Sequence, residues 1–104
     1  MSNDDPPLAK LHSQIADLEM ELAITFGQLL RLRAGAAPFE QRVRAALRER
    51  NYVEARAALS ERDAYLKEAE ILEADVRVLR AILAECHDFI SKHSARTSAS
   101  AGEA

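Results

Sequence analysis

The stretch that decides the fold runs from Leu8 to Leu32 and reads LAKLHSQIADLEMELAITFGQLLRL. A series of positions in it recurs at alternating spacings of three and four residues: Leu8, Leu11, Ile15, Leu18, Leu22, Thr25, Leu29 and Leu32. Only Thr25 in this series is not apolar. These spacings place the side chains on one face of an α-helix, as in a helix that packs along another helix. The sequence therefore predicts an all-α fold with coiled-coil character.

The composition agrees with long helices and limits the classes of protein. The chain has 104 residues, one domain's length, with only three glycines and three prolines. A net charge of -3 gives no general attraction to nucleic acid or to a membrane surface. No apolar run approaches the roughly 18 to 20 residues that span a bilayer. The single cysteine excludes an internal disulfide, so we expect a cytoplasmic protein.

Glycine and proline predict where the first helix ends. We expect this helix over residues 8–33, after a flexible lead over residues 1–7. Gly35 would supply a left-handed stop, because glycine adopts that conformation without steric cost. Pro38 would then open a second helix over residues 38–50, since a proline in the first turn removes no hydrogen bond.

A second break is predicted at Asn51. Asn51 and Glu54 form a capping box, which favours a third helix over residues 52–91. A break at Ser60, or no break at all, remains as an alternative, and in the latter case the second and third helices are continuous. These readings give either a helical hairpin or a three-helix bundle. The single helical domain would cover residues 8–93, and the polar tail over residues 94–104 would be disordered.

The third predicted helix carries a second apolar seam. At 1.5 Å per residue the three helices measure about 39, 20 and 60 Å, so this seam would extend beyond the first helix. Burying a leucine-sized side chain stabilises by about 1.5 to 3 kcal/mol, so such a seam calls for a partner. The predicted interaction surface consists of Leu72, Val76, Leu79, Ile82, Leu83, Cys86, Phe89 and Ile90.

We therefore expect a protein–protein interaction module, an adaptor, chaperone or regulator that binds another protein or copies of itself. In size, charge and helix pattern the chain is similar to small secretion and flagellar export chaperones, which pair helices around an apolar groove for a client. The alternative is a small dimeric nucleic-acid-binding regulator. Its basic surface would consist of Arg42, Arg44, Arg48, Arg50 and Arg56, among which glutamates are interleaved.

The residues do not form a pattern typical of catalysis or metal binding. Cys86 and His87 are adjacent, whereas two ligands on one helix need a spacing of three or four residues. There is no glycine-rich phosphate loop and no nucleophile motif. Cys86 lies on the second seam, where we expect it to pack as a small apolar group. We expect no enzymatic activity, no metal site and no cofactor.

Overall fold

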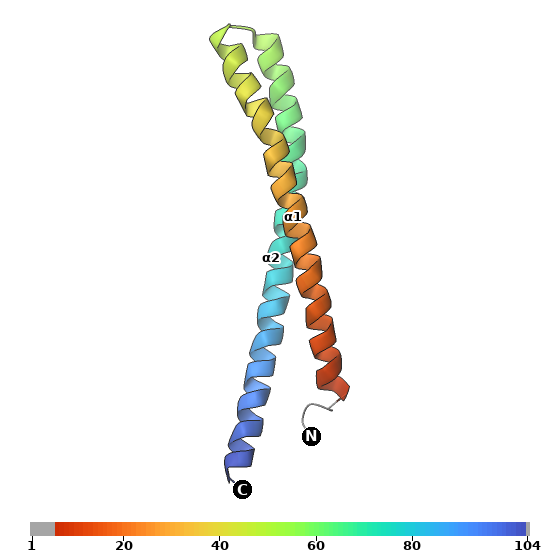
Figure 1. Cartoon of the computed structure of the whole chain (residues 1–104). Coiled ribbons are helices and arrows are strands. Elements are labelled where there is room, and N and C mark those ends of the chain that lie inside the picture. The colour runs from red at the N-terminus through yellow and green to blue at the C-terminus, as the bar shows by residue number, and fades with distance from the viewer. Residues whose placement is uncertain (1–5, 104) are drawn as a thin grey trace. The chain divides into compact units, whose positions relative to one another are not determined.

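The computed structural model describes residues 6–103, with side chains over residues 7–94. Within this range two helices, α1 (Pro6–Arg48) and α2 (Tyr52–Glu103), are joined by a turn at residues 49–51 (Figure 1). The predicted all-α helical hairpin is confirmed. The three-helix bundle is wrong, because the helices predicted over residues 8–33 and 38–50 are one helix of 43 residues.

The chain divides into two compact units. The turn unit, Ala23–Val76, contains the hairpin turn, and the end unit combines Met1–Leu22 with Arg77–Ala104. Each unit consists of one segment of α1 and one segment of α2. Most of the flexible lead predicted over residues 1–7 lies outside the described residues, and Pro6 and Pro7 begin α1.

The helix α1 continues through Gly35 because its seam continues in register. Gly35 does not adopt a positive φ, so it does not act as a helix stop. After Leu32 the spacings of three and four residues go on, and every position in the continuation is buried or half-buried: Ala36, Phe39, Val43 and Ala46. Tertiary burial of this face therefore outweighs the local glycine and proline signals, which are worth only a few kcal/mol together.

Pro38 lies inside α1 rather than at the start of a helix. Proline has no N–H, so the carbonyl of Ala34 has no partner four residues later. Pro38 and Ala34 are both exposed, and water can therefore satisfy that carbonyl. The missing hydrogen bond weakens α1 without ending it.

The turn after α1 is a Schellman motif closed by an arginine. The backbone N–H of Asn51 donates to the carbonyl of Ala46 at 2.8 Å, and that of Arg50 donates to the carbonyl of Leu47 at 3.1 Å. Arg50 has a φ of 58°, in the left-handed region that glycine usually occupies at this position. This conformation ends α1 and reverses the chain direction.

The same short turn also caps α2. The backbone N–H of Glu54 donates to Oδ1 of Asn51 at 3.2 Å, and Ala55 N–H donates to the Asn51 carbonyl at 3.1 Å. Asn51 is therefore the N-cap of α2, and the predicted break there is confirmed. A break at Ser60, or a continuous helix through Asn51, is wrong. The prediction ended the last helix at Ser91, whereas α2 continues to Glu103, since no proline or glycine lies between Pro38 and Gly102.

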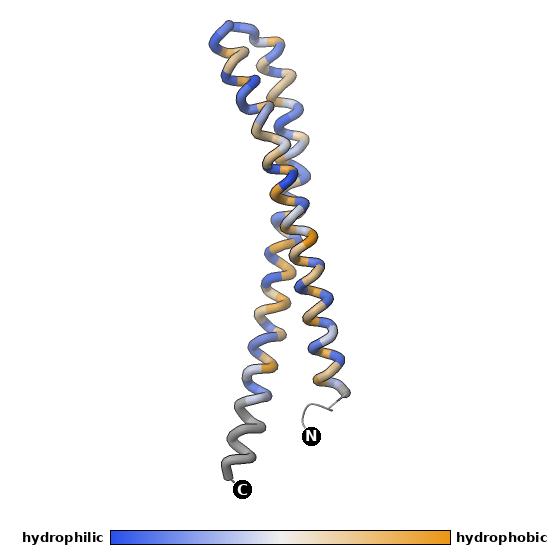
Figure 2. Tube along the Cα trace, viewed as in Figure 1, coloured by the Kyte–Doolittle hydropathy of each residue, from blue (hydrophilic) through white to orange (hydrophobic). Residues whose placement is uncertain are grey.

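The seam predicted from Leu8 to Leu32 is confirmed, because all eight of its residues are buried or half-buried. Apolar residues recur along α1 and along the coloured part of α2, as Figure 2 shows. The buried residues of the turn unit are mostly alanines: Leu29, Ala36, Ala46, Ala55, Ala58, Ala69 and Val76. Those of the end unit are larger: Ile15, Leu79 and Leu83. Small side chains let the helix backbones approach closely in the turn unit.

Candidate functional site

The residues of the predicted interaction surface fall into two groups. Val76, Leu79 and Leu83 are buried on the side of α2 that packs against α1. Leu72, Cys86 and Ile90 are half-buried on the same seam, while the other two residues, Ile82 and Phe89, are exposed. The predicted overhang assumed a first helix that ends at residue 33. In the structure α1 has 43 residues and α2 has 52, so α2 is only nine residues longer and the argument from helix lengths is wrong. Most of the predicted surface is therefore an internal seam.

The pairing between helices closes one flank of this seam. In the end unit Nε2 of His87 lies 3.6 Å from Oε1 of Glu19. In the turn unit Arg33 pairs with Glu73, and Leu59 and Leu66 are half-buried on that side of α2. Each helix has two seam residues in every seven. All four paired residues directly follow the second of these two seam residues, the position at which an antiparallel coiled coil places pairs between its helices. We call this side the closed flank.

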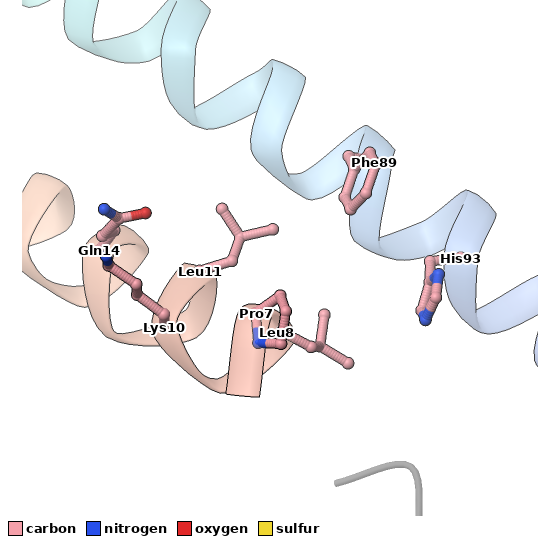
Figure 3. Close-up of a pocket in the computed structure, with 7 residues that line it drawn as sticks. All are labelled: Pro7, Leu8, Lys10, Leu11, Gln14, Phe89 and His93. Atoms are coloured by element: carbon pink, nitrogen blue, oxygen red, sulfur yellow. The ribbon is translucent and has the colours of Figure 1, made fainter. Parts of the chain in front are cut away.

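The opposite flank of the end unit is hollowed. One pocket of about 450 Å³ lies between the start of α1 and the later part of α2, and its lining includes Leu8, Leu11, Phe89 and His93 (Figure 3). A second pocket, of about 410 Å³, is lined by Leu11, Gln14, Asp17, Leu18, Glu21, Ile82 and Cys86. Because both pockets include Leu11 and Gln14, they form one groove, which we call the end groove.

The end groove has an apolar floor and two different rims. Leu8, Leu11, Leu18 and Cys86 of the seam form the floor, and all four are half-buried. The α1 rim is polar and consists of Lys10, Gln14, Asp17 and Glu21. Figure 3 shows Leu8 and Leu11 projecting from α1 toward the side of α2 that carries Phe89 and His93. An apolar floor beside a polar rim fits a site that accepts the apolar face of a helix.

The rim of the end groove on α2 is apolar. Ile82 is 38% exposed and Phe89 is 58% exposed, and the Phe89 ring stacks on His93 at a centroid distance of 6.2 Å. Val78, 57% exposed, lies one turn before Ile82 on the same side of α2. We call Val78, Ile82 and Phe89 the α2 ridge. The Phe89 ring therefore lies at the rim beside His93.

The turn unit has a smaller hollow on the corresponding flank. This pocket of about 390 Å³ is lined by Gln28, Arg31, Leu32, Tyr65, Glu68 and Leu72, so the predicted Leu72 belongs here. The Tyr65 ring stacks on Phe39, with centroids 5.7 Å apart and planes inclined by 28°. Nearer the turn, Arg42 lies 3.9 Å from Glu61 and partly closes this flank.

The structure does not place the predicted basic surface on one face. Arg42 and Arg44 are two residues apart, so they point about 200° from each other around α1. Arg42 lies 5.4 Å from the centroid of the Phe39 ring, and Nε of Arg48 donates to the Arg44 carbonyl at 3.4 Å. Arg50 is in the turn. Arg56 lies on α2, in a pocket with Tyr52, Val53, Ala57 and Ser60.

The residues considered for metal binding are placed separately. Cys86 is a free, half-buried thiol on the floor of the end groove. His87 is exposed and faces Glu19 on the closed flank. Across the part of the chain that the structure describes, no three side chains of histidine, cysteine, aspartate or glutamate are grouped to hold a metal ion.

Sequence reasoning missed the α1 half of the end groove. The spacing from Leu8 to Leu32 predicts a helix packed along another helix, and it does not mark Leu8, Leu11 and Leu18 as the floor of an open groove. The signal for openness is the asymmetry of the flanking positions of α2, which carry Ile82 and Phe89 on one side and Arg80 and His87 on the other. Which of these two sides of α2 stays open depends on the α1 residues that lie beside it, and these follow from the structure.

No known protein family, curated protein or solved structure matches this chain. None of the helices, over the residues that are described, is both long enough and apolar enough to cross a membrane.

Proposed function

We propose that the protein is a non-enzymatic protein–protein interaction module that binds an apolar helix in the end groove. The observation that supports this function is the groove itself. Its floor consists of the apolar seam residues Leu8, Leu11 and Leu18, and they stay half-buried in the free chain. A helix in the groove would complete their burial. An adaptor, a chaperone and a regulator all need such a surface.

The exposed apolar side chains contribute part of the free energy that association requires. Ile82 and Phe89 are each roughly half exposed, and burying a large apolar side chain completely stabilises by about 1.5 to 3 kcal/mol. Covering each of them would therefore contribute about 1 kcal/mol, and the leucines of the floor would add similar amounts. Association costs several kcal/mol of translational and rotational freedom, so the whole groove has to be covered for stable binding.

Affinity capture with matched variants tests this function. The full chain would be tagged and compared with a groove variant, Ile82→Glu with Phe89→Glu, after both are shown to be equally helical. The control variant, Met20→Glu with Leu30→Glu, adds the same charge at exposed sites that line none of the four pockets described above.

The expected result is that the groove variant loses bound protein, whether a second copy or another chain, and the control variant keeps it. Because the control has the same added charge, such a difference is not a general effect of charge on solubility. If the groove variant retains every bound chain, the end groove is not the binding surface and the proposal is wrong.

A further inference from the structure

We propose that the occupant of the end groove is a second copy of this chain, with the α2 ridge of each copy lying in the end groove of the other. This inference rests on the proposed function and specifies its partner. It begins with a feature of the end unit that a foreign helix would not explain. The groove and an exposed apolar ridge lie on the same flank of the same unit.

A two-fold axis can satisfy both features at once. A dimer with this symmetry uses one patch on both chains, so each patch must contain a projection and the hollow that receives it. The α2 ridge projects from the rim, and the hollow lies between that rim and α1. A foreign helix in the groove would cover the floor, while leaving Val78 exposed on the ridge unless it also supplied a hollow of its own.

The spacing of the ridge matches the spacing of the pockets. On the α2 side the two pockets are bounded by Ile82 with Cys86 and by Phe89 with His93, so they repeat every seven residues. Ile82 and Phe89, which bound the two pockets, are also the two largest residues of the ridge, so the ridge has the same seven-residue period. Seven residues of helix rise about 10 Å. The ridge of one chain can therefore present one side chain to each pocket of the other.

The exposed area of the chain agrees with a dimer. Its accessible surface is 7928 Å². A compact monomer of 11.5 kDa would expose about 5,800 Å², so the excess is about 2,100 Å². This excess is larger than the roughly 800 Å² that each partner buries in a standard interface.

Sedimentation equilibrium of the full chain over a range of micromolar concentrations tests the proposal. We expect the wild type and the control variant, Met20→Glu with Leu30→Glu, to sediment as dimers. The groove variant, Ile82→Glu with Phe89→Glu, should sediment as a monomer with unchanged helicity. A wild type that stays monomeric throughout overturns the proposal, and so does a dimer that only the control variant disrupts or that neither variant disrupts.

Cys86 provides a second measurement that needs no folded variant. Its thiol lies on the groove floor, so a second copy would cover it. Alkylation of the wild type by a bulky maleimide should slow by at least tenfold between dilute and concentrated protein. An alkylation rate that stays as fast as in dilute protein, at concentrations where the wild type sediments as a dimer, overturns the proposal.

The two proposals can fail separately. A monomeric wild type whose groove still captures a different protein overturns the second copy and supports the proposed function. A monomeric wild type that captures nothing through the groove overturns both.

Discussion

Replacing Gly35 by alanine should destabilise the hairpin, whereas the same change at Gly27 should stabilise it. Both glycines lie inside α1, where alanine is favoured over glycine by about 0.8 to 1.0 kcal/mol. A Cβ at Gly27 would meet only the guanidinium of Arg31, at 3.8 Å. A Cβ at Gly35 would lie 2.9 Å from Cε1 and 3.1 Å from Cδ1 of Tyr65, closer than carbon atoms can approach without movement.

The expected magnitudes follow from these two terms. Forcing an extra methyl group into a packed site costs about 1 to 3 kcal/mol, which exceeds the gain in helix propensity. Gly35→Ala should therefore lower the free energy of unfolding by up to about 2 kcal/mol, while Gly27→Ala raises it by about 1 kcal/mol. The Tyr65 ring is also held by its stacking on Phe39, so it cannot move away without losing that contact.

Urea denaturation followed by far-ultraviolet circular dichroism would measure both changes, at one protein concentration because association would shift the stability. The decisive control is Tyr65→Ala, which removes the ring. In that background Gly35→Ala should become stabilising by about 1 kcal/mol, as at Gly27. If Gly35→Ala stabilises the protein that contains Tyr65, the packing of the Tyr65 ring against Gly35 is wrong.

Three further changes test the turn and the proline of α1 by the same denaturation assay. Arg50→Gly should raise the free energy of unfolding by up to about 1 kcal/mol, since glycine adopts a φ of 58° without strain, and a loss of stability would argue against the left-handed turn. Asn51→Ala should lower the free energy of unfolding by about 1 kcal/mol because the Glu54 N–H loses its acceptor, whereas Asn51→Ser should keep most of that stability. An alanine variant as stable as the wild type would contradict the role of Asn51 as the N-cap. Pro38→Ala should stabilise α1 by up to about 3 kcal/mol by restoring the hydrogen bond to Ala34, whereas a destabilised variant would mean that a helix starts at Pro38.

Much of the fold was predictable from short patterns along the sequence. The seam from Leu8 to Leu32 predicted a helix packed along another helix, and Asn51 with Glu54 predicted the start of α2, because a cap acts over only three residues. Gly35 and Pro38 misled the prediction. Each is a local signal for a helix end, but the apolar register continues past both, and the burial of that face outweighs the local cost.

The candidate site was predicted only in part. Ile82, Cys86 and Phe89 line the end groove, whereas Val76, Leu79 and Leu83 are buried in the hairpin. The sequence pattern marks a residue as apolar and assigns it to a helix face. It does not say whether that face meets the other helix of the same chain or a partner, because both environments exclude water equally well.

The two seams and the charged residues beside them follow from spacing along the chain, and the capping box of Asn51 and Glu54 favoured a turn at Asn51 over a break at Ser60. Which flank Glu19 and His87 close, and which flank stays open above Leu11 and Leu18, becomes visible in the folded chain. An antiparallel pair of helices makes a core one layer thick, and its two flanks differ according to which residues meet across the seam. Which residues of α1 and α2 lie opposite each other depends on the register between the two helices, and the turn at residues 49–51 sets this register.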